Sequence, residues 1–132
     1  MNKKVLIWVL LTVMLPFACS RPVSDEFFEP TSDRDAYGRF CFNIDMADST
    51  ISYNISLMTF FGGKGHNSEP FITMPLDMMW ESPEGKQYEE NVVIDVGYLL
   101  YRENIRPIKA GVWHLYIKVP EDSLRKYKFN GM

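Results

Sequence analysis

The side chains that most often carry catalysis or bind metals are few in this chain, and their spacing suits neither task. Its two histidines, His66 and His114, lie far apart, and neither has a cysteine or a second histidine at the spacing of a zinc site. Glu89 and Glu90 are neighbours in a predicted strand, where consecutive side chains point to opposite faces. They therefore cannot share a proton as a catalytic dyad does. We expect no catalytic residues, no metal and no other cofactor.

The size and charge of the chain narrow the class of protein further. It has 132 residues, with 14 Lys and Arg against 17 Asp and Glu, for a formal net charge of −3 at pH 7. This length is typical of one domain, and such a domain can bury a sizeable core without disulfides. The mildly acidic balance gives no electrostatic reason to bind a phosphate backbone. We therefore expect no nucleic-acid partner.

The first of the two cysteines, Cys19, follows a segment typical of secretory signals. Lys3 and Lys4 precede an apolar run at residues 5–15, which is too short to cross a bilayer. Ala18 and Cys19 then resemble the lipobox of bacterial lipoproteins, although Pro16 stands where the lipobox usually has leucine. This resemblance implies a signal peptide over residues 1–18 and a diacylglycerol thioether on Cys19. An ordinary cleaved signal with a structural Cys19, or an uncleaved anchor, is the alternative.

A spacer and then a run of strands follow the signal. Residues 19–37 are rich in Pro, Ser and acidic residues, which predicts a lipidated tether whose later part packs along the domain. From residue 38 to 132, apolar residues alternate with period two, the pattern of strands with one buried face. Pro75 interrupts one of these strands and indicates an edge position or a bulge. The predicted strands cover residues 40–46, 51–57, 72–80, 87–96 and 111–119, with a weak strand at 97–101 and a helical turn at 122–128.

This arrangement predicts an all-β fold, an antiparallel β-sandwich of the immunoglobulin-like or jelly-roll-like type. We expect Trp80 and Trp113 to pack in the core, and Cys41 to be a small buried residue rather than a nucleophile. Tyr98, Tyr101 and Tyr116 are expected to be accessible. The candidate binding surface is the outward face of the last long strand, which carries His114, Tyr116 and Lys118.

The chain also resembles a known family. It is similar to the small lipoproteins of Bacteroidota, and in particular to the gliding-motility-associated lipoprotein (GldH-like) family. The matching features are Cys19, the tether residues 25–28, the strand at 39–45, the hairpin at 82–86 and the strand at 111–117. The resemblance implies an envelope component that acts through protein contacts. Family members continue past Met132 with a last strand, so either this chain is truncated or that strand is missing here, and the sheet edge that it leaves would be open to a partner.

Two short segments resemble the sequences that these bacteria O-glycosylate. They are Asp48-Ser49-Thr50 and Asp122-Ser123-Leu124, and both lie at predicted strand boundaries. Ser49 and Ser123 are therefore candidate glycosylation sites. The first segment is also typical of turn chemistry, which explains it without a sugar.

Taken together, the sequence predicts a non-enzymatic, lipid-anchored lipoprotein of the bacterial cell envelope, on the periplasmic or surface face of the outer membrane. Its partners would be the membrane and other envelope proteins, and it would serve as an assembly subunit, for example of a gliding-motility or secretion apparatus. The alternative is a carbohydrate- or peptide-binding module, because exposed aromatic residues can stack on sugars. A small hydrolase is the third possibility and would need a carboxylate and a hydroxyl beside His114.

Overall fold

The computed structural model describes residues 24–61, 73–95 and 98–132, so the expected signal peptide, Cys19 and His66 lie outside the described residues. Eight strands account for just over half of the described chain, two short helical segments add to them, and turns and loops make up the rest. The elements are η2 (Thr31–Asp33), β1 (Arg39–Met46), β2 (Tyr53–Met58), β3 (Phe60–Phe61), β4 (Thr73–Glu81), β5 (Gln87–Asp95), β6 (Tyr98–Ile105), β7 (Gly111–Lys118), α2 (Glu121–Lys126) and β8 (Phe129–Gly131).

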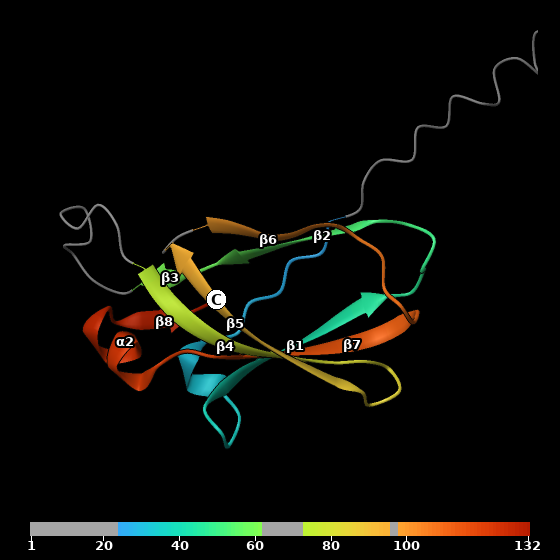
Figure 1. The fold of residues 1–132 in the computed structure, drawn as a ribbon. Helices are drawn as coiled ribbons and strands as arrows, with labels where there is room; N and C mark the ends of the chain where they lie inside the picture. The colour runs from blue at the N-terminus through green and yellow to red at the C-terminus, as the bar shows by residue number, and fades with distance from the viewer. Residues whose placement is uncertain (1–23, 62–72, 96–97) are drawn as a thin grey trace, which may run out of the picture.

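The strands form an antiparallel β-sandwich, as the sequence predicts (Figure 1). One layer is a four-stranded sheet in the order β1-β7-β4-β5, and β2-β6 and β3-β8 make two-stranded sheets on the other side. The pairing is nested, since β4 pairs with β5, β2 with β6, and β1 with β7. In an immunoglobulin sandwich the first two strands are neighbours, so this order is closer to a jelly roll.

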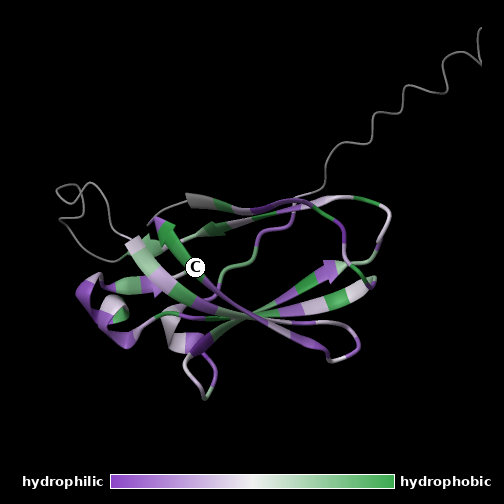
Figure 2. Ribbon diagram, in the orientation of Figure 1, coloured by the Kyte–Doolittle hydropathy of each residue, from purple (hydrophilic) through white to green (hydrophobic). Residues whose placement is uncertain are grey.

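Along β4 and β7, every second side chain is apolar and points into the space between the two layers. In β7, Trp113, Leu115 and Ile117 are buried, and the residues between them face outward. Figure 2 shows the same alternation as bands of colour along β4 and β7. The fully buried side chains come mainly from the four-stranded sheet: Phe40, Met74, Leu76, Ile94, Leu115, Ile117 and Val119.

Two prolines mark the end of the β4–β7 ladder. The ladder runs from Glu81 opposite His114 to Asp77 opposite Lys118. Pro75 lies two residues beyond its last pair on β4, and Pro120 lies two residues beyond it on β7. β4 is thus an interior strand over its second half, and Pro75 falls where β4 has only β5 as its neighbour. No bulge interrupts the β4–β5 register, so the edge-like position is what accommodates the proline.

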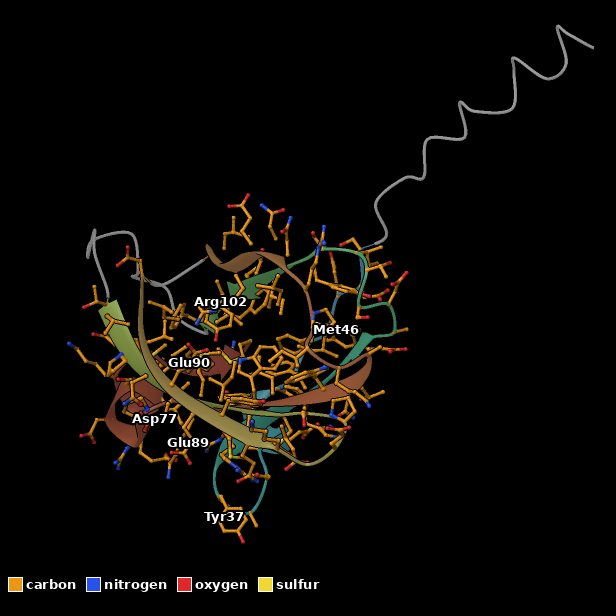
Figure 3. The ribbon with its side chains drawn as sticks, turned by 45° about the vertical axis from the view of Figure 1, so that its right-hand side comes forward. Tyr37, Met46, Asp77, Glu89, Glu90 and Arg102 are labelled. Atoms are coloured by element: carbon orange, nitrogen blue, oxygen red, sulfur yellow. The ribbon has the colours of Figure 1, made fainter. Side chains whose placement is uncertain are left out.

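β6 differs most from the sequence prediction. It is eight residues long, and Tyr101, which we expected to be accessible, is only 6% exposed. The Tyr101 hydroxyl accepts a hydrogen bond from Trp80 Nε1 at 3.2 Å, which links the two layers. The Arg102 guanidinium lies 4.3 Å from the Tyr101 ring centroid and forms an ion pair with Glu90 of β5. Figure 3 shows Glu90 and Arg102 on the inner side of β5, with Asp77 and Glu89 on its outer side.

The last residues of the chain form a strand that the sequence does not predict. Phe129–Gly131 form β8, which pairs with β3 on one side and bridges to Pro30 on the other. The Glu29 N–H donates to the Met132 carbonyl at 2.9 Å, and the Met132 N–H donates back at 3.2 Å. Residues 129–131 thus end the described chain as a short strand, and the expected absence of a further strand past Met132 stays a prediction. The folded body also begins at Glu29, inside the segment that the sequence assigns to the tether.

Candidate binding surface

The structure brings the three predicted surface residues together on the outer face of the four-stranded sheet. Tyr116 and His114 are half-buried and Lys118 is exposed, and all three point away from the core. The register of β1 against β7 places a β1 side chain beside each of them. The neighbouring pairs on this outer face are Arg39 with Lys118, Cys41 with Tyr116, and Asn43 with His114.

The most organised feature of this face is a cation enclosed by two aromatic rings. The Arg39 guanidinium carbon lies 4.3 Å from the Tyr116 ring centroid and 5.1 Å from the Tyr37 ring centroid. Attraction of a guanidinium to each ring face contributes about 0.5–1 kcal/mol at an exposed site. Tyr37 itself is 74% exposed and projects from the loop before β1 (Figure 3). We call these three residues the Tyr37–Arg39–Tyr116 stack.

Asp35 holds the stack in place from below. Its Oδ1 accepts hydrogen bonds from the N–H groups of Tyr37, at 2.9 Å, and Arg39, at 2.8 Å. Its Oδ2 accepts a hydrogen bond from Arg39 Nε at 2.8 Å, which is also an ion pair. Gly38 closes the loop at a φ of +75°, a backbone conformation that glycine adopts without strain. The loop between η2 and β1 is thus built around one carboxylate.

These contacts shift the pKa values of the two titratable groups beneath the stack. Burial raises the pKa of Asp35, but hydrogen bonds from Arg39 and Tyr37 and the charge of Arg39 lower it by more, so this pKa is below its ordinary value. Burial and the nearby negative charge of Asp35 raise the pKa of the Cys41 thiol. Cys41 is half-buried on the outer face, not in the core as expected, and its Sγ lies 3.6 Å from Asp35 Oδ2. A protonated thiol is a poor nucleophile.

The lowered pKa of Asp35 makes the stability of this loop depend on pH. A carboxyl whose folded pKa is depressed stabilises the fold above its unfolded pKa, about 3.9, and that contribution is lost as the pH falls through the folded pKa. In Asp35→Asn, the amide N–H₂ would face the Arg39 donor. We expect a loss of about 1 kcal/mol in the free energy of unfolding at pH 7.

Urea titrations from pH 2 to pH 7 would measure this effect. The difference in stability between the parent chain and Asp35→Asn should shrink as the pH falls below 4. Asp33→Asn is the matched control, since Asp33 is an exposed carboxylate in the same segment. A difference that stays constant over the whole pH range would contradict the role of the Asp35 charge.

His114 does not have the surroundings of a catalytic base. Its Nδ1 shares a hydrogen bond with the amide oxygen of Asn43 at 2.6 Å, and its ring lies 6.4 Å from that of Tyr116. Glu81 is its register partner in β4 and accepts a hydrogen bond from Gln87 instead. In the part of the chain that the structure describes, no three His, Cys, Asp or Glu side chains gather as they would around a metal ion.

Trp80 and Trp113 are the other aromatic side chains that could bind a ligand, and they lie together at one end of the sandwich. Trp113 is buried and Trp80 half-buried, with ring centroids 6.5 Å apart. Trp113 Nε1 donates to the Lys109 carbonyl, and Trp80 Nε1 donates to Tyr101, so both indole N–H groups are satisfied within the protein. They line a cavity of about 180 Å³, smaller than the 300–1,000 Å³ typical of ligand sites. The other lining residues are Met46, Ile105, Arg106, Pro107 and Ile108.

Comparison of the chain with protein-family models, with curated proteins and with solved structures finds no match. Among the described residues, no helix is long and apolar enough to cross a membrane.

The two candidate glycosylation sites lie in different settings. Ser49 is exposed in the turn after β1, where Asp48 Oδ1 accepts hydrogen bonds from the N–H and the hydroxyl of Thr50. These hydrogen bonds lower the pKa of Asp48. Ser123 lies inside α2 and is half-buried, rather than at the strand boundary expected for it. Modification of either serine stays a prediction, and Ser49 is the more accessible of the two.

The Tyr37–Arg39–Tyr116 stack is the feature of the candidate surface that sequence reasoning missed. Tyr116 was expected on this face, whereas Tyr37 lies in the expected tether and Arg39 opens β1. One signal was available, since an outward-facing Arg39 begins the strand whose inward residues are Phe40 and Phe42. Its pairing with β7, however, depends on a register that no local pattern encodes.

Proposed function

We propose that this chain is a non-enzymatic, lipid-anchored lipoprotein of the bacterial cell envelope, and that it serves as an assembly or interaction subunit. Cys19 would carry the lipid, and the outer face of the four-stranded sheet would contact a partner protein. A subunit of a gliding-motility or secretion apparatus fits this role, as the family resemblance implies. The signal-like residues 1–18 support the location, and the Tyr37–Arg39–Tyr116 stack supports the binding role.

The stack is the observation that carries the proposal. Tyrosine and arginine are enriched among the residues that dominate protein interfaces. Tyrosine buries a large area at a small cost in side-chain entropy, because it has only two side-chain torsions. Here the hydrogen bonds of Asp35 hold the guanidinium between the rings before any partner arrives. A surface organised in advance loses less conformational freedom on binding. The neighbouring Lys118 and the half-buried His114 would border such a contact.

Site-specific photocrosslinking in cells would test the binding role. A benzophenone amino acid at Tyr116 should give discrete protein adducts, and the same amino acid at Ile51, which is 49% exposed outside this face, should not. Placed at Lys118 instead, the crosslinker leaves the stack intact, and its adducts should weaken in an Arg39→Lys background, because lysine keeps the charge but loses the planar stacking group. Equal adduct patterns at Tyr116 and Ile51 would count against the proposal.

The anchor is tested separately. Intact-mass measurement of the mature protein should find it beginning at Cys19 with acyl chains attached, and Cys19→Ala should shift it from the membrane fraction to the soluble fraction. Several acyl chains hold a protein on a membrane where one does not, so the shift should be large. A mature protein that carries residues upstream of Cys19, or no acyl group on it, would remove the proposed location.

Carbohydrate binding is the second candidate, and the exposure of Tyr37 is what favours it. An exposed ring beside Tyr116 could stack on a sugar. The two tryptophans do not support it, because their N–H groups are occupied within the protein. Calorimetric binding to envelope polysaccharides that disappears in Tyr37→Ala would favour this candidate over a protein partner.

A further inference from the structure

The second layer of the sandwich carries an exposed apolar patch on its outer side. Its five large apolar residues are each between 42% and 55% exposed, and they lie together rather than scattered singly. They come from the segment before η2 and from β2, β3 and β6. We call them the Phe28 patch: Phe27, Phe28, Met58, Phe60 and Leu100.

Contacts and register connect four of the five residues, and Phe27 is next to Phe28 in the chain. The rings of Phe28 and Phe60 meet edge to face, with centroids 5.3 Å apart. Met58 lies two residues before Phe60, and it faces outward because its neighbour Leu57 is buried in the core. Leu100 of β6 is opposite Ser56, which places it diagonally beside Met58. A group of large apolar side chains on a protein surface indicates an interaction site.

The short sequence distance between the patch and Cys19 indicates which partner covers the patch. Only five residue steps separate Cys19 from Ser24, the first described residue, and eight separate Cys19 from Phe27. A fully extended chain spans at most about 3.6 Å per residue, so a lipid on Cys19 would hold Ser24 within about 18 Å and Phe27 within about 29 Å of the membrane surface. In Figure 1 the described chain begins beside the start of β2, the strand that contributes Met58 to the patch.

We propose that the Phe28 patch rests against the lipid bilayer and fixes the orientation of the anchored domain. This inference rests on the lipid anchor of the proposed function. Phenylalanine, leucine and methionine side chains partition into the boundary between headgroups and acyl chains, as on amphipathic helices that lie at the interface. The two outer faces of a sandwich point in opposite directions. The patch would therefore turn the Tyr37–Arg39–Tyr116 stack away from the membrane.

The charges around the patch specify the kind of bilayer. Asp25 and Glu26 are exposed acidic residues directly before Phe27. Arg102 of β6 is ion-paired with Glu90, so its charge is largely compensated within the protein. Carboxylates beside an anionic surface are repelled. We therefore expect the patch to prefer a zwitterionic bilayer, with apolar burial rather than charge as the source of attraction.

Photocrosslinking to lipid tests the proposal in the complete lipidated protein. A benzophenone amino acid replaces either Phe60 in the patch or Val93, which is 69% exposed on β5 of the opposite layer. Each protein is reconstituted into phosphatidylcholine vesicles and irradiated, and its phospholipid adducts are then quantified by mass spectrometry. Phospholipid adducts should be several-fold more abundant at Phe60 than at Val93, and replacing part of the phosphatidylcholine with phosphatidylglycerol should reduce them.

A second variant connects the adducts to the patch as a whole. Phe27→Asp should leave acylation of Cys19 and attachment to vesicles unchanged, and it should sharply reduce lipid adducts at Phe60. Val93→Asp is the control and should leave them unchanged. Thermal unfolding of both variants checks that the fold is intact.

The outcomes separate the two proposals. An acylated, vesicle-bound protein with equal lipid adducts at Phe60 and Val93, or with protein adducts at Phe60 in native membranes, would overturn the orientation and leave the anchor standing. A protein with no acyl group on Cys19 would remove both the anchor and the inference that depends on it.

Discussion

Replacing Phe129 with alanine is expected to lower the free energy of unfolding by about 3–5 kcal/mol, the range for removing a buried aromatic ring from a core. Phe129 is 5% exposed, and its ring lies 5.6 Å from that of Phe40 and 5.4 Å from that of Phe61. It therefore connects the three-residue strand β8 to both layers. Loss of the ring would leave a cavity that the short strand cannot collapse to fill.

Urea unfolding followed by tryptophan fluorescence would measure this change. Ile108→Ala is the matched control, because Ile108 is 84% exposed and its truncation should cost less than about 0.5 kcal/mol. A cost for Phe129→Ala as small as that of the control would mean that β8 is not packed as described.

Gly131→Ala should destabilise the protein by about 2–4 kcal/mol, although it adds only one methyl group. A Cβ at this position would lie 2.6 Å from the carbonyl oxygen of Glu29 and 2.7 Å from Cζ of Phe28. The first of these atoms belongs to the backbone, which is held by its own hydrogen bonds to Met132. The clash therefore has to be relieved by separating residues 28–29 from β8.

Gly85 supplies the control for this substitution. It has a φ of +83°, and nothing lies within 4 Å of an added Cβ, so Gly85→Ala tests backbone conformation without crowding. Its cost should be about 1–2 kcal/mol. If Gly85→Ala proved clearly more destabilising than Gly131→Ala in the same denaturation assay, the close approach of residues 28–29 to β8 would be wrong.

Long, regular strands are the part of the fold that could be predicted from the sequence. The alternation in β7 placed Trp113 inward and Tyr116 outward, and the hairpin after β4 brought Trp80 opposite Tyr88. Each of these depends only on the period of two along a strand of eight or nine residues and on a tight turn. Local patterns of this kind are preserved because a shift by one residue would expose the entire core face.

The parts that could not be predicted depend on contacts distant in sequence. β3 has two residues and β8 has three, which is too short for any period to be visible. Tyr101 lies in a strand whose apolar residues do not alternate, and its burial depends on the opposite layer. The Tyr37–Arg39–Tyr116 stack joins residues almost 80 positions apart, and the loop that positions it comes from a segment whose composition is typical of a spacer.

The pair of backbone hydrogen bonds between Glu29 and Met132 determines where a mechanical force on the N-terminal segment would act. A pull on the N-terminal segment reaches Glu29 before it reaches β1, and there two backbone hydrogen bonds, the Pro30–Gly131 bridge and the hydrogen bond from Thr31 to the Phe129 carbonyl hold the chain. If the proposed anchor on Cys19 pulled on this segment, its contacts with β8 would be the first to bear the tension. These contacts would break before the strands of the opposite layer, so the outer face of the four-stranded sheet would keep its structure under load.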